Sequence, residues 1–75
     1  MQNVIAENQM GERLIDKTFL DDDVAQAVFA SAIRCEDCGW AMLIDGMTGE
    51  LVADWNKGTL SFYNFSDAKI LRHIR

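Results

Sequence analysis

The residues with the clearest chemical character are two cysteines, Cys35 and Cys38, separated by Glu36 and Asp37. Thiolates bind zinc, and they are also the nucleophiles of thiol–disulfide exchange. A spacing of two residues allows one turn to carry both sulfur atoms. The chemistry to be considered for this segment is therefore metal binding or redox exchange, and both depend on how the chain places the pair.

The segment Cys35-Glu36-Asp37-Cys38-Gly39 resembles one knuckle of a zinc ribbon. The resemblance covers five residues and implies a zinc ion held by two thiolates. A structural zinc site needs four ligands, and the chain has no second cysteine pair. His73 is its only histidine, so one chain offers Cys35, Cys38 and His73, and the fourth position falls to a carboxylate, water or a second subunit. A homodimer would supply four cysteines.

A redox role for the same pair is a third interpretation, because Cys-x-x-Cys motifs often lower a thiol pKa. That activation uses the N-terminus of a helix, whereas this pair follows a predicted helix, where the helix dipole disfavours a thiolate. Glu36 and Asp37 act in the same direction. The favoured interpretation is two reduced thiols in a connection between helix and strand, with zinc binding as the alternative.

No other pattern predicts catalysis, and we expect a protein that is not an enzyme and has no cofactor. Gly46 and Gly49 lie in a predicted hairpin turn with no helix after it, so they do not form a phosphate-binding loop. Asp45, Glu50 and Asp54 flank the same hairpin, but carboxylates are common near turns without forming an acid–base pair.

Composition places the chain among ordinary globular proteins. Its 75 residues form a single predicted domain, 1–75, with 49% hydrophobic and 25% charged residues. Residues 1–68 carry four Lys/Arg and twelve Asp/Glu, a net charge of −8, and 69–75 reduce this to −5. Such an acidic body disfavours direct nucleic-acid binding. No membrane span or secretory signal is visible, so we expect a cytoplasmic protein with no membrane partner.

Residues 40–64 are the scaffold around which the fold is predicted. Three β-rich runs are separated by two glycine-containing turns, which predicts a three-stranded antiparallel meander. The runs are 40–44, 50–55 and 59–63. In the middle run Leu51, Ala53 and Trp55 share one face, which we expect to be buried. Residues 4–6 and 14–19 predict an N-terminal hairpin, with a helix over 3–17 as the alternative.

A helix is predicted over 22–35 because apolar residues recur there at three- and four-residue spacing. They are Val24, Ala25, Val28, Phe29, Ala32 and Ile33, while Gln26 falls largely outside the stripe. Asp21, Asp22 and Asp23 supply a cap and negative charge at the helix N-terminus. Ser66 is the predicted cap of a short C-terminal helix, 66–74. The expected fold class is α+β, with the small antiparallel sheet packed against helix 22–35.

These features favour a small acidic protein-binding module, regulatory or inhibitor-like, without catalytic activity. Anti-CRISPR and other phage-encoded inhibitors are similar in size and charge, although no motif carries the resemblance; such an inhibitor would mimic the charge of nucleic acid. Zinc binding by Cys35 and Cys38 is the second alternative. We also expect a homodimer, because 40–44 and 59–63 contain no proline or internal lysine to block edge pairing.

Overall fold

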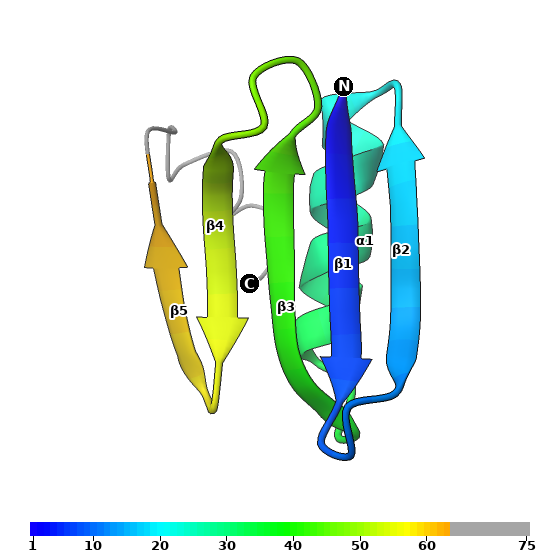
Figure 1. Ribbon diagram of the computed structural model, residues 1–75, viewed down its shortest axis with the longest axis vertical. Helices are drawn as coiled ribbons and strands as arrows, with labels where there is room; N and C mark the ends of the chain where they lie inside the picture. Colours follow the sequence, from blue (N-terminus) through cyan, green and yellow to red (C-terminus); the bar gives the residue numbers. More distant parts are fainter. Residues whose placement is uncertain (64–75) are drawn as a thin grey trace.

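The computed structural model describes residues 1–63, which form a five-stranded antiparallel sheet and one helix (Figure 1). In chain order the elements are β1 (Gln2–Asn8), β2 (Arg13–Phe19), α1 (Asp22–Ile33), β3 (Cys38–Asp45), β4 (Leu51–Asn56) and β5 (Thr59–Phe62). The predicted α+β class, with a sheet packed on a helix, is confirmed. The predicted helix 66–74 lies outside the described residues.

The strands lie in the order β2-β1-β3-β4-β5, and every neighbouring pair is antiparallel. Because β2 and β3 are both antiparallel to β1, they run parallel to each other with β1 between them. A connection between parallel strands has to cross the sheet, and α1 makes this crossing. Figure 1 shows α1 lying across one face of the sheet, alongside β1, β2 and β3.

Of the two runs considered for edge pairing, 40–44 and 59–63, the first is not a sheet edge. Residues 40–44 lie in β3, which pairs with β1 on one side and with β4 on the other. The N-terminal strands extend the sheet and cover the edge that the meander alone would leave open. The two edges of the five-stranded sheet are therefore β2 and β5.

The core lies between α1 and the sheet face that α1 covers, and Phe29 at its centre is completely buried. Its buried members are Val4, Ala6, Ala25, Phe29, Cys38, Ala41, Leu43, Val52 and Ala53. Alanines on β1, β3 and β4 leave space for the large ring of Phe29, as close packing requires. The alternation of side chains along β1 and β3 places the remaining residues of these strands on the opposite face.

The predicted inner face of β4 is correct for Ala53 and Trp55 and wrong for Leu51. The pairing with β3 shifts register between Leu43 and Ile44, so that Ala53 lies opposite Leu43 but Leu51 lies opposite Ile44. Val52 is the extra residue of this β-bulge and is only 5% exposed, whereas Leu51 is half-buried and outside the core. A bulge adds one residue to a strand, which a strict two-residue period cannot anticipate.

Helix α1 is capped by Asp21, whose Oδ1 accepts a hydrogen bond from the Asp23 backbone N–H at 2.9 Å. The helix ends at Ile33, two residues before the predicted end. Its buried side is also rotated: Val24 is 45% exposed, and Gln26, expected outside the apolar stripe, is 1% exposed. Gln26 Nε2 donates to Gln2 Oε1 at 3.4 Å, so the side of the helix that carries Gln26 faces β1.

No helix within residues 1–63 is long and apolar enough to cross a membrane, since α1 has twelve residues.

Candidate functional site

The two cysteines lie in one tight turn between α1 and β3. The Cys38 backbone N–H donates to the Cys35 carbonyl oxygen at 3.1 Å, which closes the turn. Both are free thiols, but their surroundings differ: Cys35 is exposed, while Cys38 is 3% exposed and belongs to the core. Both cysteines of the predicted pair therefore lie in one turn, but only the Cys35 thiol is exposed to solvent.

Burial favours the protonated form of the Cys38 thiol. Its Sγ donates to the Trp40 carbonyl oxygen, with 3.5 Å between the two atoms. Burial raises the pKa of Cys38 above the ordinary thiol value, and the neighbouring Cys35 raises it further because two thiolates would repel each other. Cys38 is therefore a poor nucleophile at neutral pH.

Within residues 1–63, no three His, Cys, Asp or Glu side chains gather closely enough to hold a metal ion. The third candidate ligand, His73, lies outside the described residues. The zinc alternative for Cys35, Cys38 and His73 therefore stays a prediction.

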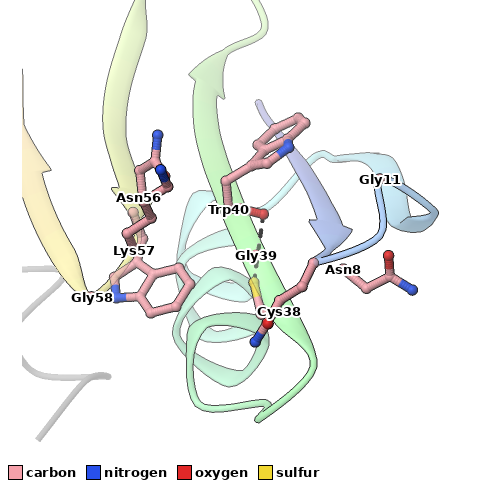
Figure 2. A pocket seen from close by; sticks show the side chains of 10 residues that line it. Asn8, Gly11, Cys38, Gly39, Trp40, Asn56, Lys57 and Gly58 are labelled. Atoms are coloured by element: carbon pink, nitrogen blue, oxygen red, sulfur yellow. Dashed lines mark hydrogen bonds between the residues drawn. The ribbon is translucent and has the colours of Figure 1, made fainter.

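A groove of about 690 Å³ opens beside this turn, at one end of the sheet (Figure 2). We call it the end groove. Three segments line it: the β1–β2 turn, the start of β3 and the β4–β5 hairpin. The lining residues are Asn8, Gln9, Gly11, Cys38, Gly39, Trp40, Trp55, Asn56, Lys57 and Gly58. Its volume lies in the range of small-molecule sites in proteins.

The end groove exists because β3 extends beyond β4. Pairing between these strands begins at Trp40 opposite Asn56, so Cys38 and Gly39 have no partner residue in β4. On its other side β3 continues along β1, where Gly39 is the extra residue between the pairs Glu7–Trp40 and Asn8–Cys38. Residues from the start of β3 and from the β4–β5 hairpin line the groove in Figure 2.

One wall of the end groove is fixed by Asn8, whose Oδ1 accepts hydrogen bonds from the backbone N–H groups of Met10 and Glu12, each at 2.9 Å. Gln9 ties this β1–β2 turn to the cysteine turn, because its backbone N–H donates to the Asp37 carbonyl oxygen at 3.1 Å. An Asn side chain that satisfies backbone donors stabilises a tight turn. This wall is therefore held by the Asn8 side chain and by the backbone hydrogen bond from Gln9 to Asp37.

The opposite wall is the β4–β5 hairpin, whose two central residues both have positive φ: 52° for Lys57 and 85° for Gly58. A two-residue hairpin of this kind is a type I′ turn, in which Asn-Gly is the preferred sequence. Lys57 is the only non-glycine residue of 1–63 with positive φ. For an L-residue with a long side chain, this conformation costs about 1 kcal/mol.

The sheet face opposite α1, which we call the open face, has an apolar row and a polar network. Ile5, Met42 and Ile44 form the row on β1 and β3, since Ile5 lies opposite Met42 and alternates with the buried Val4 and Ala6. All three are half-buried.

The polar network of the open face joins three strands. Trp40 Nε1 donates to Glu7 Oε1 at 3.1 Å, and Glu7 Oε2 lies 3.0 Å from Arg13 Nη2. Arg13 Nη1 in turn lies 3.0 Å from Asp16 Oδ2. Because the Arg13 side chain is exposed, its ion pair with Glu7 adds little to stability. The hydrogen bond from Trp40 to Glu7 orients the indole ring.

Comparison with protein-family models, curated proteins and solved structures finds no match to this chain.

The sequence patterns did not predict the polar network of the open face or the end groove. The open-face network joins residues from β1, β2 and β3 whose proximity follows from the strand order. One of the predicted glycine-containing turns, between the runs 50–55 and 59–63, does line the end groove, but a turn alone does not indicate what it faces.

The acidic residues Asp45, Glu50 and Asp54 do not form one cluster. Asp45 and Glu50 close the β3–β4 loop by a 2.8 Å backbone hydrogen bond, while Asp54 accepts a hydrogen bond from the Tyr63 hydroxyl.

The contrast between the thiols predicts two rates of modification. With Ellman's reagent at neutral pH, we expect fast reaction of Cys35 and slow reaction of Cys38, because Cys38 is buried and its pKa is raised. Since deprotonation of folded Cys38 is disfavoured, its rate should begin to rise only above the ordinary thiol pKa. Cys35→Ser should remove the fast phase and Cys38→Ser should retain it. Equal rates in the native protein would contradict this assignment.

Proposed function

We propose that the protein acts by binding another protein through the open face, without catalysing a reaction. The observation that carries the proposal is the apolar row Ile5, Met42 and Ile44 on a sheet face that no element of residues 1–63 covers. Contiguous apolar side chains that are partly exposed and have a polar rim can form a protein-interaction surface.

The rim supports the proposal because it is already ordered. Arg13 is fixed by Glu7 and Asp16, and Glu7 holds the indole of Trp40. Aromatic side chains and arginine are enriched among the residues that dominate binding energies at interfaces. Groups that are ordered before binding lose less conformational entropy when the partner arrives, so more of the contact energy appears as affinity.

Charge defines the partner's chemistry. Residues 1–63 carry four Lys/Arg and eleven Asp/Glu, a net charge of −7. The partner surface we propose is therefore basic, with an apolar centre to meet the row on the open face. Nucleic-acid-binding grooves have this basic character, and occupation of such a groove by an acidic protein would block nucleic acid. We place this function in the cytoplasm, in line with two cysteines that are free thiols.

The test compares Met42→Ser, which removes the centre of the apolar row, with Val24→Ser, which removes an exposed valine from the far side of α1. We expect the wild-type protein and Val24→Ser to capture the same partner from host lysate, and Met42→Ser to lose it. The partner should bind nucleic acid, and added wild-type protein should weaken that binding. Thermal melting of each variant shows whether it remains folded.

The association rate provides the second measurement. It should fall as salt rises from about 0.01 M to about 0.15 M, where the screening length shortens from about 30 Å to about 8 Å. Capture that is equal for both serine variants, or an acidic partner whose binding is independent of salt, would overturn the proposal.

We further propose that the chain forms a homodimer through β5. The other edge strand, β2, opposes pairing with a second copy of itself. If two β2 strands pair antiparallel about Asp16 or Lys17, that residue lies opposite the same residue of the other chain, and like charges repel. Strand β5 (Thr59–Phe62) has no charged residue. The Tyr63 N–H bonds to β4 at Val52, so by strand alternation the N–H groups of Leu60 and Phe62 point away from β4.

Ser61→Lys tests the dimer by giving β5 the charge that β2 already has. In analytical ultracentrifugation at about 100 micromolar, a concentration that detects weak dimers, we expect the wild-type chain to sediment as a mixture of dimer and 8.5 kDa monomer. Ser61→Lys should be monomeric. Ser61 lies on the open face beside Asp54, so the substitution leaves the core untouched. A wild-type protein that is entirely monomeric would contradict the proposal.

A further inference from the structure

The end groove has an unusual charge for this protein. Residues 1–63 contain eleven Asp and Glu, yet none of the residues that line the groove is acidic. The lining does contain one cation, Lys57. The lining of the groove is therefore free of the acidic residues that dominate residues 1–63, although Asp37 and Asp54 lie in the neighbouring hollows.

Lys57 is also the cation of residues 1–63 whose charge has no partner. Arg13 is paired with Glu7 and Asp16, and the N-terminal ammonium group with Asp22. The remaining two are engaged as well, since Lys17 lies 5.4 Å from the centre of the Phe19 ring and Arg34 has an interaction of its own. The ammonium group of Lys57 is thus available to an anionic ligand.

Trp55 and Asn56 precede Lys57 and add two further hydrogen-bond donors to the same wall. Within the described residues, neither the indole N–H of Trp55 nor the amide of Asn56 has a hydrogen-bond partner, in contrast to Asn8 and Gln9 on the opposite wall. Three consecutive residues therefore offer an aromatic ring, an amide and an ammonium group. An aromatic surface with a few polar groups is the usual composition of a small-molecule site.

The backbone of Lys57 provides an independent indication. A type I′ turn prefers Asn before the glycine, and Lys57 occupies this position with φ of 52°. Residues held in sparsely populated backbone conformations concentrate at functional sites. Here the unfavourable residue is the one that brings positive charge to the groove.

We propose that the end groove binds a small organic anion with a flat apolar body. Its anionic group is held by the Lys57 ammonium, and its body lies against the Trp55 indole. The volume of about 690 Å³ accommodates a molecule of this class. The site adjoins the open face, since Trp40 lines the end groove and also belongs to the rim of that face. It uses none of the apolar row Ile5, Met42 and Ile44, so its test does not depend on the protein-binding function proposed above.

The experiment uses two probes with the same rings, anilinonaphthalene sulfonate and its neutral analogue N-phenylnaphthylamine. Calorimetric titration should show saturable binding of the sulfonate to the native protein with one site per chain. The neutral analogue should bind at least about tenfold more weakly, the factor expected when a hydrogen bond to a charged group is lost. In NMR spectra the indole N–H signal of Trp55 should shift on binding.

Three substitutions separate the site from general charge effects. Lys57→Asn should weaken sulfonate binding about tenfold while raising the thermal midpoint by about 4 °C, because Asn suits the type I′ turn. Lys57→Arg, which keeps the charge, should bind within about threefold of wild type. Lys17→Asn is the matched control, since it removes the same charge from β2, and it should bind like wild type.

The proposal is overturned if the sulfonate does not saturate one site, or if the neutral analogue binds as tightly. It is also overturned if Lys57→Asn and Lys17→Asn reduce binding equally, which would indicate a general charge effect. Loss of sulfonate binding in Lys57→Asn together with unchanged partner capture would support two separate sites.

Discussion

The close contact between the backbones of Gly39 and Asn8 is the constraint on which the arrangement of this protein depends. A Cβ atom at Gly39 would lie 2.8 Å from the Asn8 carbonyl oxygen and 3.1 Å from Gln9 Cα, and neither backbone atom could move aside as a flexible side chain can. Glycine thus allows the β1–β2 turn to lie directly against the start of β3. β1 pairs with β2 on one side and β3 on the other, and this contact fixes how the β1–β2 turn meets the start of β3 at the end of that ladder.

The same contact shapes the end groove. Gly39 is the extra residue in the pairing of β1 with β3, and a bulge bends its strand. Before Trp40, β3 pairs with β1 but not with β4, and the groove lies between this part of β3 and the β4–β5 hairpin. The cysteine turn, tied to the β1–β2 turn through Gln9 and Asp37, forms the base of this region. Of the two cysteines, Cys38 therefore belongs to the wall of the groove.

Much of the fold could be predicted from local patterns, and the errors have particular causes. Apolar residues at three- and four-residue spacing identified α1. The buried side of the helix includes Gln26, which bonds to Gln2, and a polar residue cannot be found by a search for apolar spacing. The two-residue period of a strand predicted Leu51 on the buried face of β4, but the bulge buries Val52 in place of Leu51. The cysteine pair was found because its members are close in sequence. The Glu7–Arg13–Trp40 network and the end groove depend on which strands are neighbours, and short sequence windows do not contain that information.

The central claim is that Gly39 is required because a backbone lies against it, and the comparison of Gly39→Ala with Gly46→Ala in urea unfolding tests it most directly. Neither glycine has a positive φ, so strain in the backbone conformation does not separate them. A Cβ at Gly46 would meet chiefly the side chain of Met1, at 2.9 Å, and a methionine side chain can move. We predict that Gly39→Ala lowers the free energy of unfolding by about 2 kcal/mol and that Gly46→Ala lowers it by less than about 0.5 kcal/mol. Equal losses, or a Gly39→Ala variant as stable as wild type, would contradict the account.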